Sequence, residues 1–121
     1  MIAAVQLTSQ LKDGIDFITI SGRTVYDASV FRLREHVQFQ IEAGVRRFVI
    51  DVSEVPYVDS CGCGEVVSAH TSIVRAGGAL AFVNPAERVR TLWEWMKLSQ
   101  VLHIFNTIDE ARLFVLQMNN L

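Results

Sequence analysis

The sequence has no excess of positive charge, no long apolar segment and very little cysteine, and each absence narrows the possible functions. Eleven lysines and arginines stand against 13 aspartates and glutamates, a formal net charge of −2. A DNA-binding domain usually carries a basic stripe, and an anionic membrane also attracts positive charge. We therefore expect no nucleic-acid partner.

Targeting and membrane-spanning segments are also missing. No apolar stretch approaches the roughly 18 residues that a membrane-spanning helix needs. Residues 1–6 lack the basic start and apolar core of a signal peptide. These absences predict a cytoplasmic protein without a membrane partner.

Cysteine occurs only at Cys61 and Cys63. Two cysteines this close cannot easily form a disulfide within a helix, and free thiols fit a reducing compartment. No further ligands stand at the spacing that would complete a zinc site. The sequence therefore predicts neither a metal site nor a cofactor.

The 121 residues contain no low-complexity run, no internal repeat and no linker. Half of the residues are hydrophobic and a fifth are charged, as in a folded globular protein. This length supports one domain with a substantial core. We expect a single domain over residues 1–121.

Hydrophobic periodicity and turn residues predict alternating strands and helices. Right-handed crossovers should join the parallel strands into an α/β fold with one mixed sheet, an N-terminal hairpin and about four helices. Polar alternation in the first strands suggests that helices cover one face more fully. The expected strands are 3–11, 15–21, 48–52, 79–83 and 102–105, and the expected helices are 27–43, 61–75, 86–98 and a last one after Thr107.

Capping residues set the expected helix ends. Asp27 caps the first helix, Gly44 stops it, and Thr107 with Glu110 forms a capping box. Phe39 and Trp95 are expected to face outward, where each packs under a loop or marks a partner or self-association surface. The side chains expected to face the core are Val30, Leu33, Val37, Ile41, Val89, Leu92, Trp93, Met96, Ala111, Phe114, Val115 and Met118.

The segment at residues 58–64, VDSCGCG, carries the clearest functional signal. It follows a buried strand and opens a helix, so Ser60 should lie at or beside a helix N-terminus, where unpaired N–H groups favour negative charge. Gly62 and Gly64 would keep the first turn bare, so that a partner can approach closely.

A helical wheel of the following helix separates two sides. Cys63, Val66, Val67, His70, Ile73 and Val74 form the side expected to face the core. The side expected to face outward is built mostly of small residues, which suits a flat docking surface beside Ser60. Its members are Cys61, Gly64, Glu65, Ser68 and Ser72.

Three segments, at residues 48–52, 58–64 and 77–78, together resemble the STAS domain of anti-sigma-factor antagonists. The family hallmark is Asp-Ser-Ser/Thr-Gly-Leu-Gly after a buried strand, with Gly-Gly about one helix length later. The matching segments here are FVIDV at residues 48–52, VDSCGCG at 58–64 and GG at 77–78. The resemblance covers nearly the whole chain.

The resemblance implies a phosphorylation switch without catalytic activity of its own. An anti-sigma serine kinase would phosphorylate Ser60, the unphosphorylated form would bind that kinase and free a sigma factor, and a PP2C-type phosphatase would reset the switch. The protein would be a monomer or weak homodimer. The expected partner-binding residues are Asp59, Ser60, Cys61, Gly62, Gly64, Glu65 and Ser68.

The sequence departs from the family pattern at three places. Cys61 replaces the second Ser or Thr, which excludes a second phosphorylation there. Cys63 replaces the usual leucine and is expected in the core. Residues 22–25 read GRTV where the family often has Gly-Glu-Leu-Asp, so acids are missing from the loop expected to face the kinase.

Other interpretations remain open at this stage. Ser60 could be a simple N-cap, and Asp59 could orient its loop, bind the kinase's cation or make a structural hydrogen bond. Cys61 could be a redox thiol with a lowered pKa. His70 is expected to be a buried histidine with its hydrogen bonds satisfied. The whole chain could also be a constitutive scaffold subunit of a larger STAS assembly.

Overall fold

The computed structural model describes residues 6–22 and 32–118, and at Arg32, Ser60 and Cys61 it describes only the backbone. The elements confirm the predicted order of strands and helices. They are β1 (Gln6–Lys12), β2 (Ile15–Ser21), α1 (Arg32–Glu42), β3 (Arg47–Glu54), α2 (Ser60–Arg75), β4 (Ala79–Val83), α3 (Glu87–Trp95), the 3-10 helix η2 (Leu98–Gln100), β5 (Ile104–Phe105) and α4 (Ile108–Gln117).

Some expectations lie outside the described residues. These are the start of the first strand at residues 3–5, the altered loop residues at 23–25, the cap at Asp27 and the core position of Val30. Within the described ranges, no helix is long and apolar enough to cross a bilayer.

The five strands form one mixed sheet in the order β1-β2-β3-β4-β5. β1 pairs antiparallel with β2, and the remaining neighbours are parallel. This confirms the predicted hairpin and parallel strands.

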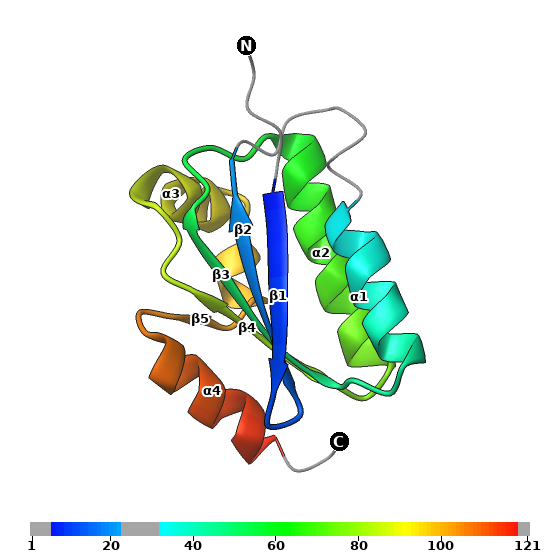
Figure 1. The fold of residues 1–121 in the computed structure, drawn as a ribbon. Helices are drawn as coiled ribbons and strands as arrows, with labels where there is room; N and C mark the ends of the chain where they lie inside the picture. Colours follow the sequence, from blue (N-terminus) through cyan, green and yellow to red (C-terminus); the bar gives the residue numbers. More distant parts are fainter. Residues whose placement is uncertain (1–5, 23–31, 119–121) are drawn as a thin grey trace.

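Helices cover the two faces of the sheet unequally, as the strand pattern suggested. The larger core joins the sheet to α1, α2 and α3, and it contains Val37, Ile73 and Trp93. The smaller core lies under α4 alone and contains Ala111 and Val115 (Figure 1). Among the described residues, β1 contributes nothing to the smaller core, and β2 contributes only Ile15 and Phe17.

The hairpin turns over two residues, Asp13 and Gly14, with φ angles of 56° and 77°. Positive φ at both positions is typical of a type I′ turn, which matches the twist of the flanking strands. Lys12, which follows the expected first strand, is the last residue of β1 and pairs with Ile15.

The buried carboxylate of Asp16 joins α1 to β2. His36 Nε2 lies 2.7 Å and Gln40 Nε2 3.0 Å from Asp16 Oδ2, and the Asp16 side chain is fully buried. The sequence did not predict a partner for His36, because Asp16 is 20 residues away from it.

Gly77 and Gly78 close α2 as predicted. Gly77 has a φ of 83°, and its N–H donates to Val74 O at 3.0 Å while Gly78 N–H donates to Ile73 O at 2.8 Å. A Cβ at Gly78 would collide with the carbonyl oxygen of Arg46. Gly78 therefore allows α2 to end against the start of β3.

α3 is shorter than predicted. It ends at Trp95, and Lys97 adopts a left-handed conformation with φ 63° before η2 begins. This break turns Met96 out of the core, where its exposed fraction is 44%. The core prediction for Met96 is therefore wrong.

The last helix begins as predicted. Thr107 Oγ1 accepts from Glu110 N–H at 3.2 Å and donates to Glu110 Oε1 at 3.1 Å. Ala111 and Val115 are buried, but Met118 lies just beyond the helix and is exposed, so its predicted core position is wrong.

Candidate partner-docking site

The predicted site lies where β3 gives way to α2. After β3, the buried side chains of Val55 and Val58 anchor the loop, and Tyr57 between them is exposed. Asp59 and Ser60 follow at the start of α2 (Figure 1). The loop is thus fixed on both sides of an exposed segment.

Asp59 is the N-cap of α2. Its Oδ1 accepts from Gly62 N–H at 2.9 Å, and its carbonyl oxygen accepts from Cys63 N–H at 2.9 Å. This confirms the structural hydrogen bond that was one interpretation of Asp59. It also corrects the alternative in which Ser60 is the cap, because Ser60 is the first residue of the helix.

The N–H groups of Ser60 and Cys61 lie in the first turn of α2. The first N–H groups of any helix have no acceptor within that helix, and the Asp59 carboxylate satisfies the one at Gly62. The accessibility of the Ser60 hydroxyl and the Cys61 thiol stays a prediction, since these side chains lie outside the described part.

The two glycines in the first turn of α2, Gly62 and Gly64, differ in solvent exposure. Gly62 is buried beneath the Asp59 cap. Gly64 is exposed, and a Cβ built on it would meet no atom within 4 Å. Nothing in the described chain therefore requires glycine at position 64.

Glu65 was predicted on the outward face of α2, but it is buried. Its exposed fraction is 6%, and its Oε1 accepts from the backbone N–H of Arg34 at 3.1 Å while Oε2 pairs with Arg34 Nη2 at 3.2 Å. Glu65 satisfies a donor in the first turn of α1, so it does not belong to an exposed docking surface.

Other residues of α2 also differ in exposure from the helical-wheel prediction. Val67 and Val74, expected in the core, are 38% and 52% exposed, whereas Ala69 is fully buried. Ser68 and Ser72, expected on the outer face, are half-buried. Because α2 packs against α1, its buried face differs from the face that the helical wheel predicted. A helical wheel considers one helix alone and cannot include such a neighbour.

Cys63 and His70 differ in burial. Cys63 is buried as predicted, and burial raises the pKa of its thiol, with a smaller rise from Asp59. His70 is half-buried, and its Nδ1 has no hydrogen-bond partner among the described residues, so the prediction of a satisfied histidine is wrong at that atom. Burial lowers the pKa of His70, and His103 lowers it further.

A groove of about 360 Å³ adjoins the start of α2, and it was not predicted from the sequence. Trp95 and Met96 are 83% and 44% exposed there, and the Arg88 guanidinium lies 5.8 Å from the centre of the Tyr57 ring. The outward position predicted for Trp95 is the only signal that could have indicated it. The lining residues are Tyr57, Val58, Asp59, Arg88, Thr91, Leu92, Trp95 and Met96.

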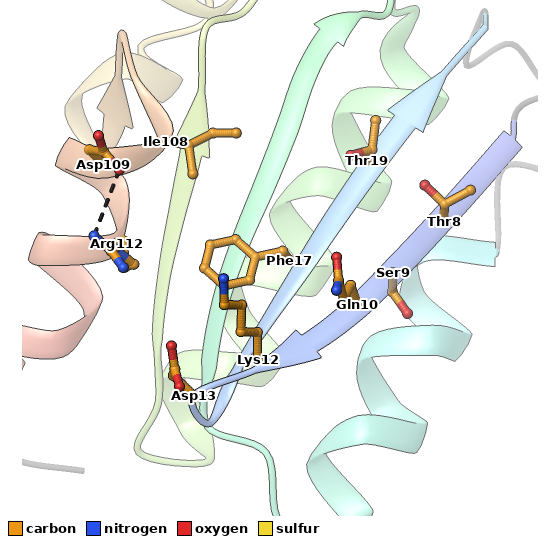
Figure 2. Close-up of a pocket in the computed structure, with 10 residues that line it drawn as sticks. All are labelled: Thr8, Ser9, Gln10, Lys12, Asp13, Phe17, Thr19, Ile108, Asp109 and Arg112. Carbon is orange, nitrogen blue, oxygen red and sulfur yellow. Dashed lines mark ion pairs between the residues drawn. The ribbon is translucent and has the colours of Figure 1, made fainter.

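A second groove, of about 530 Å³, lies on the opposite face of the sheet, between the hairpin and α4. Figure 2 shows its residues along β1 and β2, with Ile108, Asp109 and Arg112 across from them. The Arg112–Asp109 pair at 3.7 Å is exposed. This groove contains none of the predicted site residues, and no group of metal ligands gathers anywhere in the described ranges.

Comparison with known proteins identifies the same family over the greater part of the chain. The family described as the STAS domain matches residues 6–111. A Thermotoga maritima protein named "Putative anti-sigma factor antagonist" is 31% identical over 71 residues, which cover 59% of this chain and 63% of that protein. The match thus spans less than two thirds of that relative.

Two further comparisons extend over nearly the full chain. The anti-sigma-B factor antagonist of Listeria monocytogenes is 27% identical over 111 residues, 91% of this chain and 95% of that protein. The structure of the Bacillus cell fate determinant SpoIIAA in its phosphorylated form has a TM-score of 0.70 at 20% identity, covering 93% of this chain and 99% of SpoIIAA.

Proposed function

Since the chain belongs to the STAS domain family, we propose that it is an anti-sigma-factor antagonist whose binding to an anti-sigma serine kinase is switched by phosphorylation of Ser60. The observation that carries this proposal is the Asp59 cap, which makes Ser60 the first residue of α2. The protein acts by binding and has no catalytic role of its own.

The helix N-terminus explains why the domain tolerates a phosphate at Ser60. The positive end of the helix dipole and the unpaired N–H groups of the first turn stabilise negative charge. Phosphorylation therefore changes the surface that the partner meets and leaves the fold intact. The SpoIIAA neighbour has a phosphorylated form, which supports phosphorylation of this chain.

The kinase surface extends from Ser60 into the groove beside Trp95. Asp59 both caps α2 and lines that groove, so the two features are continuous. Exposed tryptophan and arginine side chains are frequent binding hot spots. An apolar side chain of the kinase fits against Trp95 and Met96, and an acidic group beside it pairs with Arg88.

Phosphorylation works as a switch through charge. It adds about 1.5 to 2 negative charges to the docking surface, which the acidic groups of the kinase repel. A loss of about 3 kcal/mol weakens binding more than a hundredfold. A PP2C-type phosphatase removes the phosphate and restores binding.

Mass spectrometry after incubation with ATP and an anti-sigma serine kinase tests the proposal. The purified chain should gain one phosphate, on Ser60, and the Ser60→Ala variant should gain none. The kinase should be the cognate one, found by its affinity for the unphosphorylated chain. Phosphate on another residue, with Ser60 unmodified, would overturn the assignment.

A further inference from the structure

β1 is an open edge of the sheet. Among the described residues it pairs with β2 alone. Its register with β2 is unbroken over all seven residues, and it contains neither a bulge nor a proline. A regular, exposed edge strand is a template for another strand, and natural proteins usually protect such an edge.

The turn determines which main-chain groups face that edge. The two-residue turn brings the carbonyl of Lys12 to the N–H of Ile15, so Lys12 directs its main-chain groups toward β2. Because direction alternates along an antiparallel strand, Leu7, Ser9 and Leu11 direct theirs to the open edge. Ser9 is the central residue of β1.

The sequence of β1 is self-complementary about Ser9. If a second strand of the same sequence, QLTSQLK, pairs antiparallel with Ser9 opposite Ser9, Leu7 meets Leu11, Thr8 meets Gln10 and Gln6 meets Lys12. Apolar residues then face apolar ones, and no two like charges are opposed. A two-fold symmetric interface requires this self-complementarity.

A groove beside β1 accommodates the leucine of the second strand. It measures about 460 Å³ and is lined by Leu7, Ser9, Glu35, His36 and Phe39. Phe39 is 69% exposed and Leu11 is 57% exposed. In the self-paired register, Leu11 of the second copy lies beside Leu7 and enters this groove against Phe39. By symmetry, Leu11 of the first copy enters the same groove of the second copy.

We infer that a second copy of this chain pairs with β1 in antiparallel register about Ser9, so that the two sheets become continuous. This interface buries Leu11 and Phe39, whose exposure the isolated chain leaves unexplained. It does not depend on the switch at Ser60, because the β1 groove and the groove beside Trp95 share no lining residue.

Cysteine cross-linking tests the register. In an antiparallel pair, opposed residues that exchange hydrogen bonds have Cα atoms about 5.5 Å apart, within disulfide reach. The Ser9→Cys variant, made in a Cys61→Ser background, should form a covalent dimer on mild oxidation. Gln10→Cys in the same background should not, since the register separates its two copies by more than about 7 Å.

Analytical ultracentrifugation tests the interface without cross-linking. The full chain should dimerise, and Leu11→Glu should weaken the dimer roughly tenfold or more, because it replaces an apolar contact with Phe39 by a carboxylate that enters the groove beside Glu35. Leu113→Glu is the matched control, because Leu113 is 54% exposed on α4, and it should leave the dimer unchanged. A monomeric wild-type chain, or equal cross-linking of both cysteine variants, would overturn the inference.

Discussion

Gly64 occupies an exposed position in α2 where a methyl group would touch nothing. Glycine inside a helix costs about 0.5–1 kcal/mol relative to alanine. The fold alone therefore favours alanine, and in the proposed complex a closely approaching partner would account for the glycine.

The Gly64→Ala variant should consequently have effects of opposite sign on folding and binding. We expect its free energy of unfolding to rise by about 0.5–1 kcal/mol in urea denaturation. Its binding to the anti-sigma kinase should be weaker by about 1 kcal/mol or more of binding free energy in calorimetry, because the methyl group would intrude on the proposed interface. Unchanged affinity in the stabilised variant would show that Gly64 lies outside the docking surface.

The structural hydrogen bond of Asp59 was among the interpretations of the sequence because helix capping is local. Asp59 and the N–H group that it caps, at Gly62, are three residues apart, so sequence alone can indicate the contact. Glu65 and Arg34 are 31 residues apart, and no local pattern indicated their pairing. For this reason the sequence misplaced Glu65 on the outer surface.

At the scale of elements, Glu65 joins α2 to the first turn of α1. Replacing Glu65 with alanine removes the acceptor of a part-buried hydrogen bond from the Arg34 N–H, and we expect a loss of about 1–3 kcal/mol in unfolding free energy. Glu94→Ala, at an exposed glutamate of α3, is the control and should change stability by less than about 0.5 kcal/mol. Equal effects of the two substitutions in urea denaturation would show that the Glu65–Arg34 contact is not stabilising.

α3 contributes an exposed aromatic to the proposed kinase surface. Trp95→Ala should leave the unfolding free energy within about 0.5 kcal/mol, because the side chain is 83% exposed. Kinase affinity should fall roughly tenfold or more, as at a hot spot.

Leu113→Ala is the control for Trp95→Ala, since Leu113 is 54% exposed and lies outside that groove. Its kinase affinity should match that of the wild-type chain. If Trp95→Ala also bound the kinase like wild type, the groove beside α3 would not be part of the docking surface.

The end of α3 was less predictable than its start. Apolar spacing alone carries the helix through Met96 to Leu98, but the left-handed Lys97 interrupts it. Lysine carries no signal for a positive φ, which is uncommon outside glycine, asparagine and aspartate. The groove lined by Trp95 and Met96 therefore emerges only from the three-dimensional structure.

At the scale of the whole molecule, the sequence predicted the mixed sheet because each element carries its own periodicity. Ala79–Val83 reads as a strand buried on both faces, and it is buried throughout. The sequence could not assign α4 alone to one face, since that depends on packing between distant elements. The sequence also did not indicate that β1 would lie at the edge of the sheet with one side unpaired among the described residues.

Burial of His70 predicts acid sensitivity of the fold. The pKa of His70 lies below its ordinary value because burial disfavours the charged ring. The unfolded chain therefore binds more protons, so stability present at neutral pH is lost as the pH falls below about 6.5. Urea denaturation at several pH values should show a shallower decline for His70→Asn than for wild type, and identical declines would exclude this cause.

The proposed switch is tested most directly by placing phosphoserine at position 60 during synthesis of the chain. The dissociation constant of its complex with the anti-sigma kinase is then compared with that of the unmodified chain by calorimetry. We expect the unmodified chain to bind and the phosphoserine chain to bind at least about a hundredfold more weakly, with unchanged circular dichroism. Equal dissociation constants for the two forms would contradict a switch at Ser60.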